Sequence, residues 1–210
     1  MTNIRQRLPE PWPEWYRYDG TWSNEGEADA GLYNWPLTEN SLVIEIGAYE
    51  GKWTERIARR YGCTVHAYEP GSRMRAVAMQ RLEDLPNVTL WPYALGGTER
   101  EATLYDCGRD GATLLVQDGS SEPCTVLLAS AEMMKFREVD LLALNCEGAE
   151  YEILENLLRN NRINGMRWLM IQWHGGTQET KLGLCERLAR THCMLWNYSY
   201  IEAWERKTNE

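Results

Sequence analysis

Four polar side chains stand where apolar, strand-like segments of the sequence end. They are Glu45, Glu69, Asn145 and His174. If these segments form one mostly parallel sheet, their carboxyl ends meet at one edge, and we expect the four side chains to share a site there. The two carboxylates can accept hydrogen bonds from a ligand, and an unperturbed imidazole titrates near neutrality. His174 is therefore the first candidate for a general base.

The segment from Leu42 to Gly51 runs from an apolar strand through a glycine loop into a helix that starts near Lys52. Its apolar residues fit a strand that is buried on both faces of a sheet. Gly47 and Gly51 allow a tight turn and a close approach of the backbone to a ligand. The helix start offers unpaired N–H groups and a partial positive charge to an anionic group. The segment predicts a cofactor-binding loop.

The charges of this loop indicate which cofactor it suits. Its spacing, Glu45-x-Gly47-x-x-x-Gly51, differs from the G-x-G-x-x-G of dinucleotide-binding loops. Glu45 and Glu50 would repel a diphosphate, but they favour a ligand with an amine and a sulfonium beside one carboxylate. S-adenosylmethionine (SAM) has those charges. Glu69, at the end of the next predicted strand, can accept hydrogen bonds from both ribose hydroxyls. A nicotinamide-dependent oxidoreductase is the enzymatic alternative, and the glycine spacing and Glu50 argue against it.

Composition limits the class of protein. Of the 210 residues, 43% are hydrophobic and 25% are charged, as in a soluble globular domain. No apolar run approaches the ~20 residues that span a membrane, and the N-terminus lacks the layout of a signal peptide. The six cysteines are scattered without a C-x-x-C pair, which favours reduced thiols over disulfides or a metal site. We expect a cytoplasmic protein with no membrane insertion and no metal.

Charge and aromatic content bear on the partners. The net charge is −9, and binding to a nucleic-acid backbone depends on Lys and Arg that neutralise phosphates. We therefore expect no nucleic-acid partner. The chain has ten Trp and eleven Tyr but a single Phe. Trp and Tyr combine a flat apolar face with a polar edge, which suits sugars and amphipathic substrates.

Many of these aromatic residues lie in the first 35 positions, within a segment that has no long periodic pattern. Residues 1–38 are rich in Pro, Trp, Gly and acidic residues, and they predict an irregular N-terminal arm or cap. The arm either packs across the domain or contacts the substrate as a lid. Residues 39–210 then form a single α/β domain.

Strand-like and helix-like segments alternate through this domain, which predicts a mostly parallel, Rossmann-like sheet with helices on both faces. Segment 100–130 contains turn signals and short β-rich pieces, and we expect hairpin-like excursions there. The final two strands are expected to form an antiparallel pair. The predicted strands are 42–46, 64–70, 88–95, 139–145, 167–174, 193–198 and 201–206, and the predicted helices are 52–61, 72–83, 147–158 and 178–190.

In these motifs the chain resembles the FkbM family of SAM-dependent methyltransferases. The matching segments are the glycine loop 43–51, Tyr68-Glu69-Pro70, Tyr93-Ala94-Leu95-Gly96, residues 140–150 with Glu147-Gly148-Ala149-Glu150, and Gln172-Trp173-His174. The likeness covers about residues 41–175 in the family's order. It implies a seven-stranded class I methyltransferase fold. It also implies methyl transfer to an oxygen, commonly a hydroxyl of a sugar or a small natural product, so the expected acceptor is a small molecule or a carbohydrate.

The resemblance also implies the site residues. The family's loop, ribose acid and post-strand segment fall on Gly47 and Gly51, Glu69, and Ala94 and Leu95. Together with neighbouring residues and the strand-end Asn145, the residues expected to bind the cofactor are Glu45, Gly47, Ala48, Tyr49, Gly51, Glu69, Pro70, Ala94, Leu95 and Asn145. Two positions depart from the family pattern. The family usually has an aspartate where this chain has Asn145, and an acid where it has Gln172. Because an amide cannot act as a carboxylate base, either the base lies elsewhere or the activity is altered. A non-catalytic SAM-binding module of the same fold is therefore the alternative.

The expected catalytic residues are His174, Glu147 and Asn145. Glu147 is the second candidate for the base, although its carboxylate would need a pKa raised by burial. Each has a structural alternative: Glu147 and Glu150 can simply offset the dipole of a helix start, and His174 can be a hydrogen-bonded loop residue. Asn145 is expected to orient the substrate or the amine of the cofactor, unless it only bonds within its turn.

Overall fold

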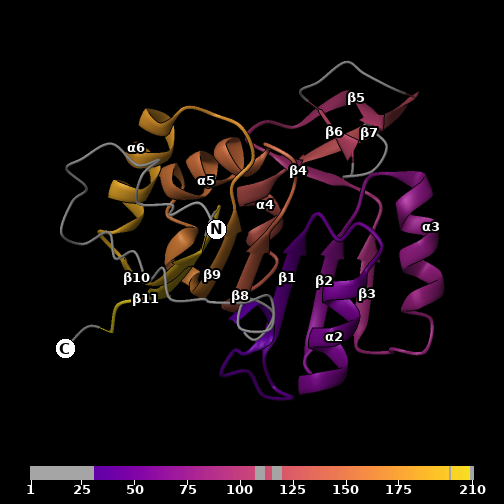
Figure 1. Ribbon diagram of the computed structural model, residues 1–210, viewed down its shortest axis with the longest axis horizontal. Helices are drawn as coiled ribbons and strands as arrows, with labels where there is room; N and C mark the ends of the chain where they lie inside the picture. The colour runs from indigo at the N-terminus through magenta and orange to yellow at the C-terminus, as the bar shows by residue number, and fades with distance from the viewer. Residues whose placement is uncertain (1–30, 107–111, 115–119, 199, 209–210) are drawn as a thin grey trace, which may run out of the picture.

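A seven-stranded sheet forms the centre of the computed structural model, which describes residues 31–106, 112–114, 120–198 and 200–208 (Figure 1). The strand order is β10-β11-β9-β8-β1-β2-β3. Neighbouring strands from β9 to β3 are parallel, while β11 is antiparallel to both of its neighbours. The strands are β1 (Leu42–Ile46), β2 (Thr64–Tyr68), β3 (Val88–Trp91), β8 (Val139–Leu144), β9 (Met166–Gln172), β10 (His192–Tyr198) and β11 (Ile201–Arg206). The predicted fold class, including the antiparallel C-terminal pair, is confirmed.

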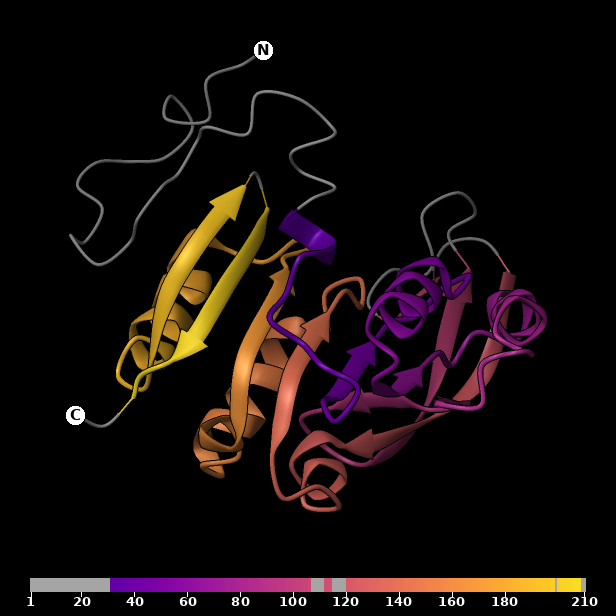
Figure 2. The ribbon, with the colours of Figure 1, turned by 90° about the horizontal axis from the view of Figure 1, so that it is seen from below.

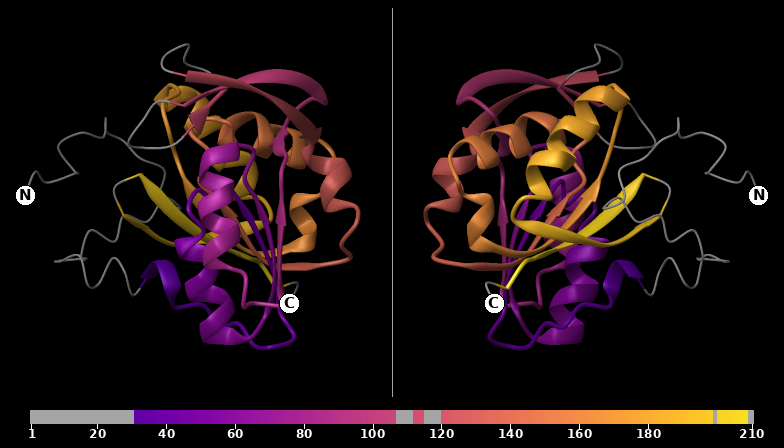
Figure 3. Two further views of the ribbon diagram at one scale, coloured as in Figure 1. Left: turned by 90° about the vertical axis from the view of Figure 1, so that its right-hand side faces the viewer. Right: turned by 90° about the vertical axis from the view of Figure 1, so that its left-hand side faces the viewer.

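Helices cover both faces of this sheet (Figure 3). The helices are α2 (Lys52–Tyr61), α3 (Ser72–Arg81), α4 (Ala129–Met133), α5 (Glu150–Arg159) and α6 (Gln178–Leu188), with a 3-10 turn, η2, at Ile163–Gly165. Helices α4, α5 and α6 bury apolar residues against one face, and α2 packs on the other. The central strands are apolar on both sides because both sides are covered.

The order of the strands reverses between β1 and β8. From β1 the chain continues to β2 and β3 on one side, and from β8 it continues to β9 on the other. In open α/β sheets such a switch point leaves a crevice at the carboxyl ends of the strands, where ligands bind. The pair β10 and β11 lies at the edge of the sheet farthest from β3 (Figure 2).

A second, four-stranded sheet lies beyond the carboxyl ends of the main sheet (Figure 1). Its order is β4-β7-β5-β6, with a small core around Leu104 and Val126. The strands are β4 (Ala94–Gly96), β5 (Arg100–Asp106), β6 (Ala112–Thr113) and β7 (Ser120–Leu128). The excursions predicted over 100–130 contribute β5, β6 and β7 to this sheet.

Two predicted elements differ from the structure by more than two residues, while the others agree within two at each end. The strand expected over 88–95 is split into β3 and β4, which belong to different sheets. Pro92 follows β3 and has no N–H to donate, so it cannot continue the ladder. The helix expected from Glu147 begins only at Glu150, because Glu147 and Gly148 have φ angles of 53° and 104°. Such angles are incompatible with a right-handed helix.

Of the predicted arm, residues 1–30 lie outside the described part of the chain. Trp35 and Leu37 are buried on the face that α2 covers. The N–H of Trp35 donates to the hydroxyl of Tyr61 at 2.9 Å. This last part of the arm therefore packs on the domain. No helix within the described residues has the length and the apolar character needed to cross a membrane.

Candidate active site

A cavity of about 690 Å³ opens at the switch point, and the second sheet forms one of its walls. This volume lies within the range of sites that bind drug-sized ligands. Its described lining includes two carboxylates and no Lys or Arg. The lining residues are Ile46, Gly47, Tyr49, Tyr68, Glu69, Pro70, Tyr93, Ala94, Leu95, Leu104, Leu114, Asn145, Cys146, Glu147, Ala149, Gln172, Trp173, His174, Gly175 and Tyr200.

The loop after β1 crosses the loop after β8 at Gly47. A Cβ atom on Gly47 would lie 1.8 Å from the carbonyl oxygen of Asn145, and the φ angle of Gly47 is +93°. Only glycine tolerates both the contact and the angle. The N–H groups of Gly47 and Ala48 both donate to the carbonyl of Tyr68, at 2.9 and 3.0 Å. These bonds hold the floor of the cavity in place.

Three residues predicted to bind the cofactor do not line the cavity. Ala48 is buried within its turn, and Gly51 gives α2 and α3 room to approach, since a Cβ there would lie 3.2 Å from the Cβ of Ala78. Glu45 points to the face of the sheet covered by α2, where its carboxyl accepts a hydrogen bond from Thr54. Burial raises the pKa of Glu45 to about 8, against the opposing hydrogen bond from Thr54. Glu45 is therefore mostly uncharged at neutral pH.

Glu69 lies at the end of β2 with its carboxyl in the wall of the cavity. Its Oε2 accepts the N–H of Tyr49 at 2.7 Å, and its Oε1 accepts the N–H of Gly71 at 2.8 Å. Burial raises the pKa of Glu69 to about 7, and these two hydrogen bonds limit the rise. A carboxyl has about four lone-pair sites. Glu69 therefore keeps acceptor capacity for hydroxyl groups of a ligand.

His174 is held by a buried carboxylate. Its Nδ1 lies 2.9 Å from Oε1 of Glu150, whose side chain is fully buried. The same carboxylate accepts the N–H groups of Cys146 at 2.7 Å and Gly148 at 2.9 Å. The positive φ angles of Glu147 and Gly148 turn the chain so that Glu150 can reach these donors. Sequence reasoning assigned Glu150 only to the helix dipole and missed this contact.

The hydrogen bonds of His174 define its tautomer. An ionised carboxylate only accepts hydrogen bonds, so Nδ1 carries the proton that faces Glu150. Nε2 then carries the lone pair of the ring, which accepts a hydrogen bond from the amide of Gln172 at 3.1 Å. Burial alone would lower the pKa of His174, but the hydrogen bond and charge of Glu150, with the charge of Glu147, raise it above 6.5. The protonated form of His174 is thereby stabilised.

Asn145 follows β8 and lines the cavity beside these groups. Its backbone N–H donates to the carbonyl of Ile46 at 2.9 Å. Its Oδ1 is buried, and it has no hydrogen-bond partner among the described residues. A buried acceptor without a partner is costly, so Oδ1 is available to a donor group of a ligand.

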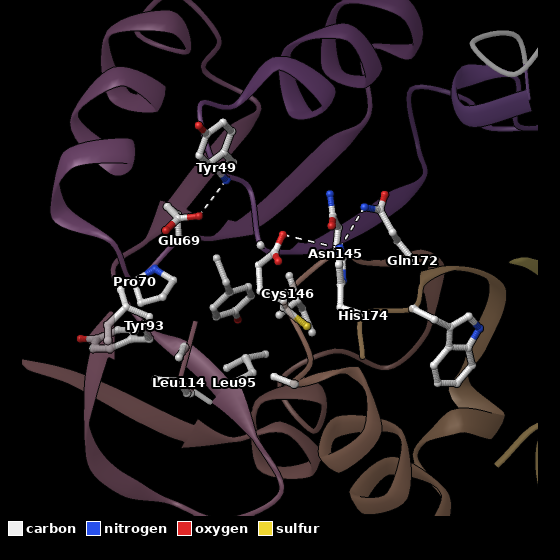
Figure 4. Close-up of a pocket in the computed structure, with 18 of the residues that line it drawn as sticks. Tyr49, Glu69, Pro70, Tyr93, Leu95, Leu114, Asn145, Cys146, Gln172 and His174 are labelled. Atoms are coloured by element: carbon white, nitrogen blue, oxygen red, sulfur yellow. Dashed lines mark hydrogen bonds and ion pairs between the residues drawn. The ribbon is translucent and has the colours of Figure 1, made fainter. Parts of the chain in front are cut away.

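The cavity therefore has two chemically different ends (Figure 4). Glu69, Pro70 and Tyr93 lie toward one end, while Asn145, Gln172 and His174 gather at the other. Of the predicted site residues, Gly47, Tyr49, Glu69, Pro70, Ala94, Leu95, Asn145, Glu147 and His174 all line it. Sequence reasoning did not find the contributions of Leu104 and Leu114, because no local signal shows that the second sheet folds over the cavity.

No metal cluster is evident in the described part of the chain: no three of its His, Cys, Asp or Glu residues are grouped so that they could hold a metal ion. The cavity offers two carboxyl groups, an imidazole held by a buried carboxylate, and an orphaned amide oxygen for chemistry. Such a set can bind hydroxyl and amine groups and can move a proton.

Several solved structures have the same fold as this chain. One is an rRNA methylase from Streptococcus thermophilus, with a TM-score of 0.50 at 14% identity, covering 89% of this chain and 99% of that chain. Another is a candidate methyltransferase from Streptococcus mutans in complex with SAH, with a TM-score of 0.53 at 13% identity, covering 88% and 99%. The fold is that of the class I methyltransferases. A fibrillarin/Nop5p complex is also similar, with a TM-score of 0.52 at 11% identity, covering 81% and 75%.

At these identities the likeness concerns the fold. No family model matches the chain, and no curated protein matches it. The resemblance to the FkbM family therefore stays a prediction.

The expectation that nucleic acid is excluded as a partner is wrong. It depended on the net charge of −9, but proteins with this fold include an rRNA methylase and a 23S rRNA methyltransferase. Net charge is a sum over the whole chain and does not report how cations are distributed on the surface. Neither the charge nor the fold rules out a nucleic-acid partner.

Proposed function

We propose that this protein is a SAM-dependent methyltransferase that methylates a hydroxyl oxygen. One observation carries the proposal: a single cavity holds a carboxyl at the end of β2, Glu69, and an imidazole oriented by a buried carboxylate, His174 with Glu150. The fold adds support, because a candidate methyltransferase that shares it was crystallised with SAH. The motifs that resemble the FkbM family lie around the same cavity, and we propose membership of that family on this basis.

The residues at the Glu69 end suit the nucleoside part of SAM. Glu69 would accept hydrogen bonds from the two ribose hydroxyls, and the apolar surfaces of Ala94 and Leu95 would lie against the base. At the other end, the buried Oδ1 of Asn145 would accept a hydrogen bond from the amine. When bound, SAM supplies an electrophilic methyl group. The absence of Lys and Arg from the described lining suits a cationic ligand.

His174 would serve as the general base. Glu150 fixes its ring and keeps the proton on Nδ1, so that the Nε2 lone pair faces Gln172 and the cavity. A hydroxyl must lose its proton as its oxygen bonds to carbon. Nε2 has a single lone pair, so the acceptor hydroxyl would take the place of the Gln172 amide before Nε2 accepts that proton. Glu147, with Oε1 3.5 Å from Nε2, would stabilise the resulting cation. In this arrangement the amide of Gln172 acts as a hydrogen-bond donor, which a carboxylate at this position could not do.

The acceptor class that we propose is a sugar, a glycan or a small natural product with a hydroxyl group. Tyr200 is 51% exposed, and its ring centroid lies 6.4 Å from that of His174. Its flat face is available to a sugar ring at the reactive end of the cavity. We place the protein in a reducing, cytoplasmic compartment, because all five described cysteines are free thiols.

The test measures SAH release from SAM by the full chain, with a panel of sugars, phenols and total RNA as acceptors. His174→Ala should lower turnover by about 10²-fold or more and leave SAM affinity near normal. Arg60→Ala, on the exposed surface of α2, is the control and should leave turnover unchanged. Unchanged turnover in His174→Ala would reject His174 as the base.

The alternative is a non-catalytic SAM-binding module, which the amides at Asn145 and Gln172 favour. It predicts SAM binding by calorimetry without SAH release for any member of the panel. A methyltransferase predicts both binding and release, so the two measurements separate the two functions.

A further inference from the structure

A second groove, of about 830 Å³, lies at the opposite edge of the sheet from the active-site cavity. It is formed by the start of β9, the loop between α6 and β10, and the end of β11. The residues that line it are Asn164, Arg167, Arg190, Thr191, Glu205, Arg206, Lys207 and Thr208. Four of these eight are cations, drawn from segments that are far apart in the sequence, and one is an acid.

The four cations have no carboxylate partner among the described residues, although the chain has 31 acidic and 22 basic residues. Elsewhere several arginines pair with acids, as Arg59 does with Asp84 and Arg100 with Glu152. In a protein with an excess of acidic groups, an unpaired cluster of cations is a local departure from the overall charge. Such a patch attracts anions.

The contacts of these cations leave their charges available. Arg206 donates to the carbonyl of Asn164 at 2.7 Å, and Lys207 donates to the carbonyl of Ala189 at 2.6 Å. The guanidinium of Arg167 stacks over the ring of Trp168, 4.0 Å from its centroid. These contacts orient the groups without neutralising them, because a carbonyl carries no net charge.

Other groups in and under the groove offset only one of these four charges. Glu205, the one acid in the lining, accepts a hydrogen bond from the indole of Trp168 at 3.0 Å. His192 lies buried next to Thr191, and its Nε2 donates to the carbonyl of Met166 at 3.1 Å. Burial, with the charges of Arg206 and Lys207, lowers the pKa of His192 to about 4, although the bond to Met166 opposes this. The groove therefore has three positive charges in excess at neutral pH.

We propose that this groove binds the phosphodiester backbone of RNA. A guanidinium binds two phosphate oxygens in a planar fork, and three of the four cations are arginines. The groove is larger than one phosphate group requires, so it suits a chain of phosphates. β9 has seven residues, so its length of about 23 Å separates this groove from the cavity at the other end of the strand. The groove is thus a docking surface separate from the reactive end, and the inference goes beyond the proposed function.

The test is fluorescence anisotropy of a labelled single-stranded RNA of about 20 nucleotides with the full chain in about 50 mM salt. Four phosphate contacts predict that log K falls with log salt with a slope of about −3. Arg167→Glu and Arg190→Glu should each weaken binding by at least about fivefold and make the slope shallower by about 1. Both side chains are exposed, so the variants should fold. Arg190→Gln removes the positive charge without introducing a negative one, and so separates loss of charge from reversal of charge.

Arg60→Glu on α2 is the matched control, because it changes the charge equally on a different part of the surface and should leave binding unchanged. No RNA binding in this buffer, or binding that Arg167→Glu and Arg190→Glu leave unchanged, would overturn the proposal. Equal binding of polyglutamate would also overturn it, since the groove would then recognise acidic peptides. If millimolar inorganic phosphate displaced the RNA completely, the groove would be a site for a single anion, and the proposal of a phosphodiester chain would be wrong. SAM binding by the same variants should be normal, which keeps this test independent of the proposed function.

Discussion

Replacing Glu150 by Gln removes the charge that orients and stabilises His174 while it keeps the size of the side chain. The carboxylate of Glu150 accepts three hydrogen bonds, from Cys146, Gly148 and His174. A glutamine has one acceptor oxygen, and its NH₂ group must then face at least one of these donors. One buried donor is left unpaired, which should lower the free energy of unfolding by about 1–3 kcal/mol.

The effect on turnover follows from the lost charge. Two unit charges 4 Å apart attract each other by about 4 kcal/mol at an effective dielectric constant of 20. Glu147 remains near Nε2 and supplies part of the attraction, so we assign about 2 kcal/mol of the stabilisation of the imidazolium to Glu150. Since 1.4 kcal/mol is a factor of ten, Glu150→Gln should slow methyl transfer by about 30-fold.

The dependence of the rate on pH distinguishes this role from a purely structural one. The base acts only when it is neutral, so kcat/KM should fall as the pH drops below the pKa of His174, which Glu150 raises above 6.5. Glu150→Gln should move this acidic limb to lower pH, because burial then lowers the pKa with less opposition. Glu152→Gln, on the same helix and paired with Arg100, is the matched control. A slower variant whose acidic limb stays at the same pH would show that Glu150 does not act through the charge of His174.

Two further predictions concern stability. Gly47→Ala should lower the free energy of unfolding by at least about 3 kcal/mol in urea, because its Cβ would meet the carbonyl of Asn145 at a φ of +93°. Gly183 lies inside α6 with open space around the position of a Cβ, so Gly183→Ala should instead raise the free energy of unfolding by about 0.5–1 kcal/mol. A similar loss of unfolding free energy in both variants would show that the contact at Gly47 is not the cause. The pKa of Glu45 is raised from 4.5 to about 8, so the folded protein holds an extra proton between these values and loses stability as the pH rises through them. Glu45→Gln removes that proton. Between pH 5 and pH 8 the free energy of unfolding of the wild type should therefore fall by about 3 kcal/mol more than that of the variant. Parallel curves of unfolding free energy against pH would show that Glu45 does not titrate in this range.

The sequence predicts much of the fold because long apolar segments alternate with amphipathic ones. The resulting parallel sheet brings Glu69, Asn145 and His174 to one cavity, as expected from their places at strand ends. Glu45 differs because side chains alternate along a strand. It shares the α2 face with Val43, so its carboxyl meets Thr54 instead of the cavity.

Other features depend on contacts that no local pattern shows. Glu150 reaches His174 only because positive φ angles at Glu147 and Gly148 turn the chain before α5. The basic groove joins residues from β9, from the loop between α6 and β10, and from the end of β11, which the sequence separates by up to about 40 positions. A net charge of −9 therefore gave no sign of a local cluster of cations.

The most direct test of the central claim is a crystal structure of the full chain with SAH. We expect SAH in the cavity at the switch point, with the ribose hydroxyls on Glu69 and the sulfur at the end that holds Asn145 and His174. A cavity that stays empty at saturating SAH, or one that takes up NAD in its place, would contradict it.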